Sequence, residues 1–482
     1  MGKRLNIDTA GKGGRGFYRE LIQLALPIAL QNFLLAAVSA SDTLMLDRLN
    51  QTAMTAVSLA SLVAFIQNML MIVITSAGTI LGSQYFGKDD MDAVKTLKNI
   101  MLRRGLACGL LFFGLCVAIP EPIMDIFTNN PELIATGARY LRFASVSYLL
   151  TGVSQVYLAM MKIIKRAGTS TAISAVAVAL NIVLNWAMIF GMGPIPAMGV
   201  AGAAISTAVA RVVELLLALF FSHRSRVFSQ PVQRVREHNH MLARDFMKVS
   251  LPLLGGIFVW GVGFTVYRIV TGHMGPDVAA ASSVASMLRD LMLSTCTGTS
   301  AAAGILVGNA LGAGDLDRGR EYGNRLLRVS LLIGLVNCAI VLALTPVLPR
   351  VVHLNDAARG YLNSMLVIIA VYMVATAATN VVINGIFAAG GDTLFNMYSL
   401  AVCMWGIAIP LTILGAFVFH WPVVVVYACT CVDEVGKIPW VLAHFKKYKW
   451  VRNLTRQDVC DYNTTDIVEY AGKLKDTLTG QR

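Results

Sequence analysis

Long apolar stretches separated by short polar segments run through the chain from residue 20 to residue 443. A helix that crosses the hydrocarbon layer of a bilayer needs about 20 mainly apolar residues. Twelve stretches of this kind are present, and we predict one membrane-spanning helix in each. They are 20–46, 53–84, 100–120, 138–161, 170–191, 199–221, 249–272, 278–311, 326–348, 361–387, 394–418 and 421–443.

The polar segments between these stretches alternate in charge. If all twelve stretches cross the membrane, the segments on one side hold most of the 40 Lys and Arg residues. These segments are the N-terminal tail, 85–104, 161–168, 222–248, 313–328, 388–393 and the C-terminal tail. The loops on the other side hold few basic residues, Arg48 and Arg350 among them. Because Lys and Arg are enriched in cytoplasmic loops, we predict that both termini lie in the cytoplasm.

Composition agrees with a membrane protein and limits the other classes. The chain has 56% hydrophobic and 14% charged residues, whereas soluble domains carry about 25% charged residues. The net charge of +13 follows the predicted topology and suits contact with anionic lipid, so we expect no nucleic-acid partner. The N-terminal residues 1–19 lack a small-residue cleavage site and are interpreted as a cytoplasmic tail, not as a signal peptide.

The two halves of the chain repeat each other. One constant offset along the chain aligns Pro27 with Pro252, Gly87 with Gly312, and the segment 55–62 with 280–287. Later the offset is expected to drift, with two further matches. These pair Tyr140 with Tyr361, and 165–171 with 388–394.

Since each half has an even number of helices, both halves start on the same side, and the repeat is parallel. We therefore predict an all-α membrane protein whose twelve transmembrane helices form two six-helix lobes. The expected parts are a tail (1–19), an N-lobe (20–221), a basic linker (222–248), a C-lobe (249–445) and a C-terminal tail (446–482). Such a repeat favours a site between lobes that rock against each other, although channels and enzymes can also contain duplicated bundles.

Polar side chains inside the apolar stretches mark candidate sites, because ionisable groups at membrane depth are costly and usually functional. Asp42 lies a few residues before the end of the first stretch. Asn181 and Asn185 share one face of the fifth, since residues four apart are neighbours on a helix. Carboxylate and amide oxygens suit hard cations. We predict that these three residues form a site for coupling to a proton or a sodium ion.

Other polar residues are assigned more weakly to a cavity or to gating. Arg289 and Asp290 are adjacent in the eighth stretch and point about 100° apart on a helix, so we expect each to need a separate partner. Arg268 is one candidate for Asp290. Gln155, Asn380 and Asn384 complete this group.

Two further groups of charges are assigned to structural roles. Arg211 and Glu214 are spaced i, i+3 and are expected to form a structural pair. We place Asp433 and Glu434 towards the cytoplasmic end of the last stretch, in a structural or gating role.

Known catalytic and metal-binding patterns are not evident. We find no phosphate-binding loop, no HExxH or GxSxG motif, and no Gly-rich dinucleotide fingerprint in a suitable context. The eight cysteines are scattered and lack metal-ligand spacing. We expect no enzyme activity, no catalytic residue, no cofactor and no metal site, and an ion gradient as the energy source.

Several motifs resemble those of the multidrug and toxic compound extrusion (MATE) transporters. They are ALPIALQNFLLAAVSASDTLML, LGSQYFGKDD, LNIVLNWAMIFGMG, ILVGNALGAGDLDRGR, FAAGGDTLFNMYSLAVCMWGIAIPL and KKYKW, in the same order as in that family. The resemblance covers about 17–455. It implies two lobes that form a V and exchange protons or sodium for amphiphilic, often cationic, compounds.

The resemblance also implies roles for individual residues. It assigns the family's helix 1 cation or proton site to Asp42, accompanied by Asn181 and Asn185. Many relatives of the DinF and archaeal type have Asp where this chain has Asn185, which favours protons over sodium here. NorM-type members use a glutamate in helix 7, which falls at Trp260, and an aspartate in helix 10, where this chain offers no central carboxylate. A NorM-like second-lobe cation site is therefore expected to be absent, and coupling is expected to run through the first lobe.

Two alternatives to drug–ion antiport stay open. A flippase of the same superfamily would carry lipid-linked precursors, for which Arg268 and Arg289 are the only hint. A membrane enzyme or a passive channel would need no coupling carboxylate. The expected partners are small amphiphilic molecules and membrane lipids, and the chain is expected to act as a monomer.

Overall fold

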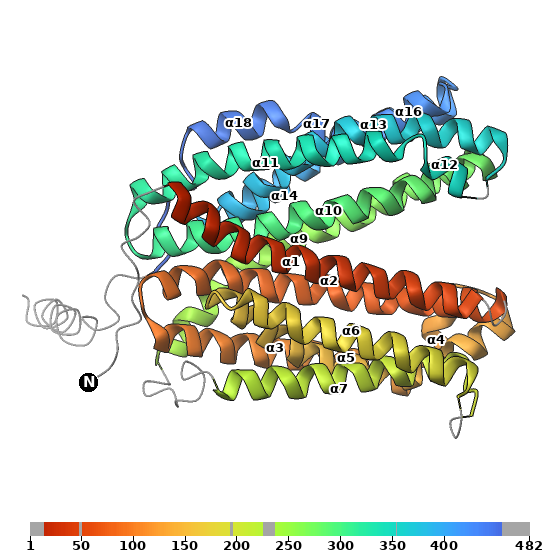
Figure 1. The fold of residues 1–482 in the computed structure, drawn as a ribbon, viewed down its shortest axis with the longest axis horizontal. Coiled ribbons are helices and arrows are strands. Elements are labelled where there is room, and N and C mark those ends of the chain that lie inside the picture. Colours follow the sequence, from red (N-terminus) through yellow and green to blue (C-terminus); the bar gives the residue numbers. More distant parts are fainter. Residues whose placement is uncertain (1–13, 48–50, 193–195, 225–236, 353, 456–482) are drawn as a thin grey trace, which may run out of the picture.

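The computed structural model describes the chain except residues 1–13, 48–50, 193–195, 225–236, 353 and 456–482. Some side chains near helix ends, including that of Asp42, also lie outside the described residues. The described part consists of long, roughly parallel helices joined by short turns (Figure 1).

The first half contains six long helices. They are α1 (Gly14–Asp47), α2 (Gln51–Gly87), α3 (Met91–Ala118), α5 (Pro131–Ile163), α6 (Ala167–Phe190) and α7 (Val200–Arg224), with a short α4 (Pro120–Asp125) after α3. The second half begins in the same way. It has α9 (Glu237–His273), α10 (Pro276–Gly312), α11 (Leu316–Leu344), the short α12 (Leu348–Val351) and α13 (Asp356–Asn380), which continues as the π-helix η2 (Val381–Phe387).

The last two membrane helices are irregular. The eleventh membrane helix consists of α14 (Thr393–Leu400), η3 (Ala401–Ala408), α15 (Ile409–Ile413) and η4 (Leu414–Val418). The twelfth membrane helix is broken into α16 (Val423–Thr430), α17 (Val432–Val435) and α18 (Ile438–Lys446). We call it helix 12, which is distinct from the short α12. All twelve predicted stretches fall on helices, so the predicted helix count is confirmed.

Within the described residues, ten helices are long and apolar enough to cross a membrane. The remaining two predicted spans are α1, part of whose side chains lie outside the described residues, and the interrupted helix 12. The protein is therefore a multi-pass membrane protein.

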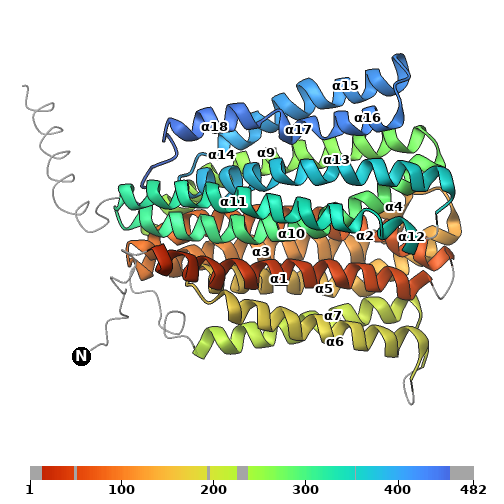
Figure 2. The same ribbon diagram turned by 45° about the horizontal axis from the view of Figure 1, so that its top comes forward.

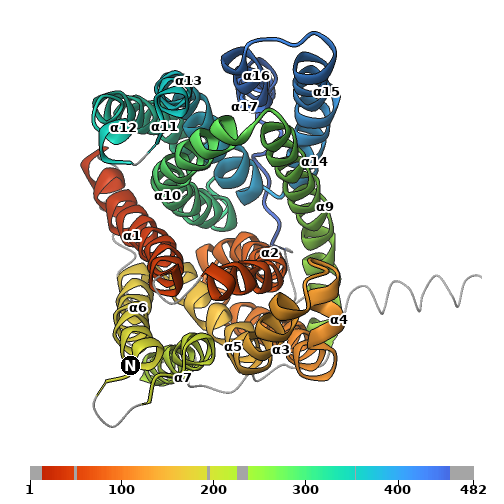
Figure 3. The same cartoon turned by 90° about the vertical axis from the view of Figure 1, so that its right-hand side faces the viewer.

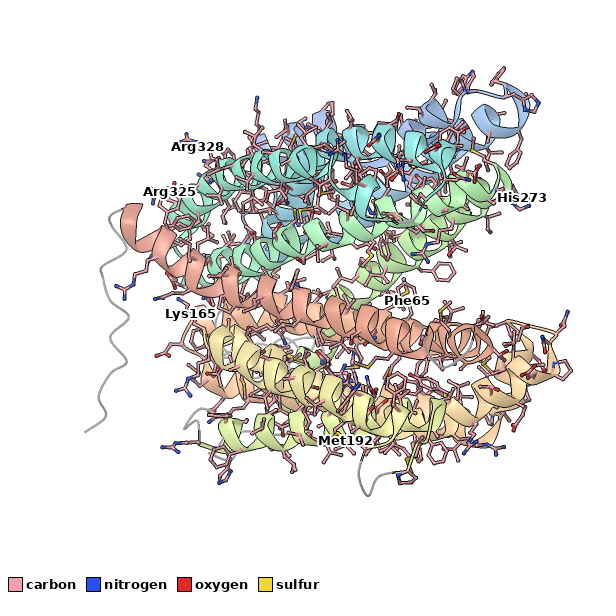
Figure 4. The ribbon with its side chains drawn as sticks, turned by 45° about the vertical axis from the view of Figure 1, so that its right-hand side comes forward. Phe65, Lys165, Met192, His273, Arg325 and Arg328 are labelled. Atoms are coloured by element: carbon pink, nitrogen blue, oxygen red, sulfur yellow. The ribbon has the colours of Figure 1, made fainter. Side chains whose placement is uncertain are left out.

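The helices form two lobes that approach each other at one end and diverge at the other (Figures 1 and 4). Lys165, Arg325 and Arg328 lie at the end where the lobes approach, and Met192 and His273 lie at the far end (Figure 4). We call these the basic end and the open end. Seen along the helices, α2–α7 lie in one lobe and α9–α18 in the other, with α1 along one edge of their junction (Figure 3).

Equivalent helices of the two lobes start at the offset that relates Pro27 to Pro252, which confirms the internal repeat. Both α2 and α10 have 37 residues. The next helix of each lobe begins with an Asp N-cap: Asp90 accepts a hydrogen bond from the amide of Ala93, and Asp315 from that of Arg318. These caps satisfy otherwise free amides of the first turn.

The two later matches predicted from the sequence, Tyr140 with Tyr361 and 165–171 with 388–394, are not structurally equivalent. The N-caps of α5 and α13 are Asn130 and Asn355, which keep the same offset as Asp90 and Asp315. The positive-φ residues Lys165 and Gly391, which precede α6 and α14, depart from it by a single position. Backbone turn geometry therefore preserves the register more faithfully than the Tyr and Gly identities used to align the sequence.

The lobes touch closely at the basic end through two glycines related by the repeat. A Cβ atom at Gly87 would lie 2.1 Å from the backbone oxygen of Asn309, and one at Gly312 would lie 1.9 Å from that of Gln84. Only glycine permits this backbone approach. Helices α2 and α10 are thus sealed against each other where the lobes converge.

The residues after α18 strengthen this seal. The side chain of Gln84, on α2, donates a hydrogen bond to the backbone oxygen of Ala389 (2.6 Å) and accepts one from the amide of Leu454 (2.6 Å). Trp450 is fully buried against the second lobe. The first part of the predicted C-terminal tail therefore packs across both lobes.

Candidate functional site

A buried polar network in the first lobe joins α6 to α7. Asn181 and Asn185 are 4% and 0% exposed, because their shared face of α6 packs against α7. The Asn185 amide donates to the Asn181 side-chain oxygen (3.2 Å), and the Asn181 amide donates to the Thr207 hydroxyl (3.3 Å). The Ser206 hydroxyl donates to the side-chain oxygen of Asn185. The part of the network that the structure describes is uncharged, and its amide oxygens are hydrogen-bonded.

Asp42 belongs to the neighbouring helix α1, but its side chain lies outside the described residues. Two hydrogen bonds fix α1 against α6: Thr171 donates to the backbone oxygen of Pro27 (2.7 Å), and Gln31 donates to Ser174 (2.7 Å). Met45, one turn beyond Asp42 in the chain, packs on the cluster of α2, α6 and α7 residues near the open end. This part of α1 is therefore held beside the helices that carry the amide network.

A second polar group of the first lobe lies on α7. Glu214 is 1% exposed and forms the predicted pair with Arg211 (2.7 Å), which is thus confirmed. The Ser154 hydroxyl of α5 donates to the same carboxylate oxygen (3.0 Å). Gln155, the next residue on α5, is partly buried.

The second lobe repeats this arrangement on its own sixth helix. The Thr379 hydroxyl of α13 donates to Glu434 of α17, and Lys437 forms an ion pair with the other Glu434 oxygen (2.6 Å). Thr379 is related to Ser154 by the offset of the repeat. Glu214 and Glu434 depart from that offset, but both lie on the sixth helix of their lobe. Lys437 is 2% exposed, and hence this ion pair is enclosed by protein.

Asp433 adds a carboxylate that is not fully hydrogen-bonded. It is 1% exposed, and among the described residues its Oδ1 atom has no hydrogen-bond partner. Its electrostatic neighbours include Glu434, Lys437 and Arg289. The hydroxyl of Tyr267, a residue that interacts electrostatically with Asp433, likewise has no hydrogen-bond partner in the described structure. Buried polar atoms are normally paired, so these two atoms mark a place where a proton or a small ligand could bind.

The expected position of Asp433 near the basic end is wrong. Helix 12 is interrupted around α17, and α17 lies midway along the bundle, between α16 and α18 (Figures 1 and 2). Asp433 consequently interacts with Tyr267, in the part of α9 nearer the open end, and with Arg289 of α10. In the sequence, this site is indicated by the pattern Asp-Glu-x-x-Lys inside an apolar stretch. Like Asp42, the pattern places ionisable residues at membrane depth.

Arg289 and Asp290 correct another expectation. They do pair with each other: the Arg289 guanidinium donates two hydrogen bonds to one Asp290 oxygen, at 3.0 and 3.1 Å. The guanidinium also lies 4.8 Å from the centre of the Phe264 ring. The long arginine side chain reaches the neighbouring carboxylate, although adjacent residues of a helix point about 100° apart. Arg268, the expected partner of Asp290, is exposed.

Two asparagines were predicted on the tenth apolar stretch, 361–387, which the structure forms from α13 and η2. Both lie at its irregular end. The backbone oxygen of Asn380 accepts a hydrogen bond from the Ser300 hydroxyl (3.0 Å). Asn384, in η2, is exposed and accepts a hydrogen bond from the Asn396 side chain (3.1 Å). The structure therefore does not bring the predicted cavity residues into one cluster.

Comparison with known families decides what kind of protein has this fold. The MatE family model matches the chain twice, over residues 27–187 and 252–414, and together these matches cover well over half of the chain. The chain belongs to the MATE family. The two matches start at positions related by the offset of the repeat, so the duplication found in the sequence is the duplication of the family itself.

Curated relatives of this MATE transporter include two proteins described as probable multidrug resistance protein NorM. The one from Pseudomonas aeruginosa is 25% identical over 425 residues, which are 84% of this chain and 84% of the relative. The one from Thermotoga maritima is 23% identical and covers 92% of this chain and 95% of the relative.

Solved MATE structures share the fold. A multidrug resistance MATE transporter in an outward-facing conformation has a TM-score of 0.81 at 16% identity, covering 90% of this chain and 97% of the other. The Vibrio cholerae MATE transporter VcmN in its bent form gives 0.81 at 15% identity, with the same coverage.

This MATE transporter differs from the pattern that the resemblance implied for the second lobe. Trp260, on α9, occupies the position at which the resemblance placed the glutamate of the seventh membrane helix. It packs on Phe264, with ring centres 4.7 Å apart. The second lobe nevertheless contains a buried carboxylate, Asp433, and it lies in the interrupted helix 12 and not in α9 or α13.

Proposed function

We propose that this MATE transporter exports amphiphilic, often cationic, compounds in exchange for protons, with its basic end in the cytoplasm. The two lobes would alternate between the arrangement seen here, closed at the basic end, and one closed at the open end. The relatives described as multidrug resistance proteins support the class of substrate. Sodium is the second candidate for the coupling ion.

The observation that carries the proposal is a buried carboxylate at membrane depth, Asp433, one of whose oxygens has no hydrogen-bond partner among the described residues. An ionised carboxylate in such surroundings is costly, and binding a proton removes that cost. A cationic compound entering beside it would replace the proton as the compensating charge. Competition of proton and substrate for one negative charge is the physical basis of exchange.

We assign the matching role in the first lobe to Asp42, together with Asn181 and Asn185. The amide network would stabilise the carboxylate of α1 by hydrogen bonding when it releases its cation. Protons are favoured over sodium in both lobes. Asn185 supplies no charge in the first lobe, and Lys437 and Arg289 surround Asp433 in the second, whereas a bound metal cation prefers several uncompensated oxygen ligands.

The alternatives receive less support. A flippase for lipid-linked phosphates would need free cations in its cavity, but Arg289 is paired with Asp290. A passive channel would need a continuous path, whereas the backbones of α2 and α10 are in contact at the basic end.

Efflux of a fluorescent organic cation from proteoliposomes, driven by an imposed pH or sodium gradient, tests the proposal. We expect the native protein to respond to the pH gradient. Asp42→Asn and Asp433→Asn should each reduce pH-driven efflux to the level of empty liposomes. Asp317→Asn, which changes an exposed acid at the basic end, is the matched control and should transport normally.

Undiminished efflux in both carboxylate variants would rule out the proposed coupling sites. Efflux that follows the sodium gradient alone would replace the proton by sodium in the proposal. Catalytic turnover of the cation, or equally fast flux without any gradient, would instead favour the enzyme or the channel.

A further inference from the structure

An apolar cavity lies at the seam between the two lobes, in the half of the bundle nearer the basic end. It has a volume of about 350 Å³ and is lined by aliphatic side chains of α2 and α3 on one side and by Leu254 of α9 on the other. Its walls are almost wholly apolar, with Arg104 of α3 as the single charged lining residue. An apolar cavity open at the surface of a membrane protein meets lipid, not water.

Arg104 has no acidic partner among the described residues. Its guanidinium lies 4.6 Å from the centre of the Phe246 ring. One of its terminal nitrogens lies 2.6 Å from the Met247 sulfur, and the other lies 3.5 Å from the Ala243 backbone oxygen. All three partners belong to α9 and none carries a charge. An arginine in a spanning helix normally pairs with an anion or reaches towards the interface.

The neighbouring residues make this part of the surface basic. Arg244 and Lys248 are exposed on α9, next to Ala243 and Met247, which contact Arg104. Lys248 is only loosely paired with Asp245, at 3.9 Å. Arg104 therefore adds a partly buried cation to a positively charged rim, and the rim is continuous with the basic end of the bundle.

We propose that this cavity binds an anionic phospholipid of the leaflet at the basic end. Its phosphate would accept hydrogen bonds from Arg104, and one acyl chain would fill the cavity up to Leu254. A guanidinium is well suited to phosphate because it can donate two parallel hydrogen bonds. The cationic rim repels a cationic amphiphile, and a free phosphate ion would gain nothing from the apolar walls.

A lipid bound here touches α3 of the first lobe and α9 of the second. Arg104 already joins these helices through its contacts with Phe246 and Met247. The bound lipid therefore stabilises the seam in the arrangement seen here, with the basic end closed. This inference rests on the membrane location of the protein and not on the proposed antiport.

Native mass spectrometry of the delipidated full-length protein tests the site. The protein is titrated with phosphatidylglycerol or phosphatidylcholine of identical acyl chains. We expect one phosphatidylglycerol to bind more tightly than the rest, and no equivalent site for phosphatidylcholine. Arg104→Gln should weaken the first binding event roughly tenfold, the change expected when charge-assisted hydrogen bonds to phosphate are lost. Arg103→Gln, at the adjacent exposed arginine, should leave it unchanged.

A second variant tests the acyl chain. Ala107→Trp places a large side chain into the cavity without changing charge, and it should also abolish the tight site. Equal binding of both lipids, equal losses in Arg103→Gln and Arg104→Gln, or full binding in Ala107→Trp would each overturn the proposal. If millimolar inorganic phosphate displaced the bound phosphatidylglycerol, the site would be a simple anion site and the proposed lipid site would be wrong. Circular dichroism and size-exclusion chromatography confirm that each variant is folded.

Discussion

The fourth and sixth helices of the two lobes hold the same contact in two different settings. In the first lobe Ser154 donates to Glu214, and in the second Thr379 donates to Glu434. In each lobe a cation three positions away on the same helix completes the group: Arg211 before the glutamate, or Lys437 after it. Each lobe therefore contains a hydroxyl, a glutamate and a compensating cation, with Glu214 buried and Glu434 partly buried.

The difference between the lobes lies in what was added to this shared group. In the first lobe α7 is continuous, and Val213 precedes the glutamate. In the second lobe helix 12 is broken into three pieces, and Asp433 occupies the corresponding position. In the first lobe Glu214 is paired with Arg211 and also interacts electrostatically with Lys162. The second lobe keeps a carboxylate, Asp433, one of whose oxygens has no hydrogen-bond partner among the described residues. Under the proposed antiport, the group forms a structural pair in the first lobe and the proton site in the second.

The largest effect is expected from neutralising the acids of the two lobes in turn. Asp433→Asn should abolish pH-driven efflux, because an amide cannot exchange a proton. Glu214→Gln should retain most of the activity, because Glu214 is already paired with Arg211 and Ser154. Efflux from proteoliposomes under an imposed pH gradient provides the measurement. Equal losses in the two variants would erase the distinction between the lobes.

The next effect concerns stability. Lys437→Met removes the cation that pairs with Glu434, a partly buried carboxylate next to the buried Asp433. Removing one partner of a buried ion pair costs about 3–5 kcal/mol, so the midpoint of thermal unfolding should fall markedly. The double variant Glu434→Gln/Lys437→Met should recover much of the loss. Fluorescence-detected thermal unfolding in detergent compares the two, and a double variant no more stable than Lys437→Met would contradict the paired arrangement.

A smaller effect is expected in the neutral network of the first lobe. Asn185→Ala removes the hydrogen bond to the Asn181 side-chain oxygen and the acceptor of the Ser206 hydroxyl, although Asn181 still donates to Thr207 and Ser206 to the Ala203 backbone oxygen. An unsatisfied buried polar group costs about 1–3 kcal/mol. We expect a modest loss of thermal stability together with slower efflux, because the network would no longer support Asp42. Asn130→Ala, which removes an exposed helix cap, serves as the control for stability loss without an effect on transport. Normal efflux in a destabilised Asn185→Ala protein would limit the network to a structural role.

The smallest effects should come from the two equivalent hydroxyls. Ser154→Ala and Thr379→Val each remove one hydrogen bond to a glutamate that keeps its ion pair, and each should cost about 1–2 kcal/mol. Thr379→Val should in addition shift the pH dependence of efflux, since Glu434 adjoins Asp433. Ser154→Ala should leave that dependence unchanged. A shift of similar size in both variants would make the two lobes functionally alike.

The sequence predicted the helices and the repeat well because both depend on local pattern. A stretch long and apolar enough to span a bilayer becomes a helix whatever its neighbours are, since its backbone must satisfy its own hydrogen bonds in lipid. The constant offset that relates Asp90 to Asp315 was visible for the same reason, because an N-cap acts within one turn. The pair Arg211–Glu214 followed from helix spacing alone.

Predictions that depended on depth and on side-chain reach were less successful. Asp433 was placed near the basic end because helix 12 was counted as one regular helix. Arg289 was given a distant partner because only the direction of its Cβ atom was considered. Neither error could be corrected from local pattern, since a break in a helix and the path of a flexible side chain depend on the packing around them.

By itself, the sequence determined that this chain crosses the membrane twelve times, in two related halves, with buried polar groups at intervals. It did so because hydrophobicity and helix periodicity act within a few turns of the chain. Only the tertiary structure decided which of those polar groups face each other. Ser154 meets Glu214 and Thr379 meets Glu434 because helices far apart in sequence pack side by side, and that packing leaves one oxygen of Asp433 without a hydrogen-bond partner in the described structure.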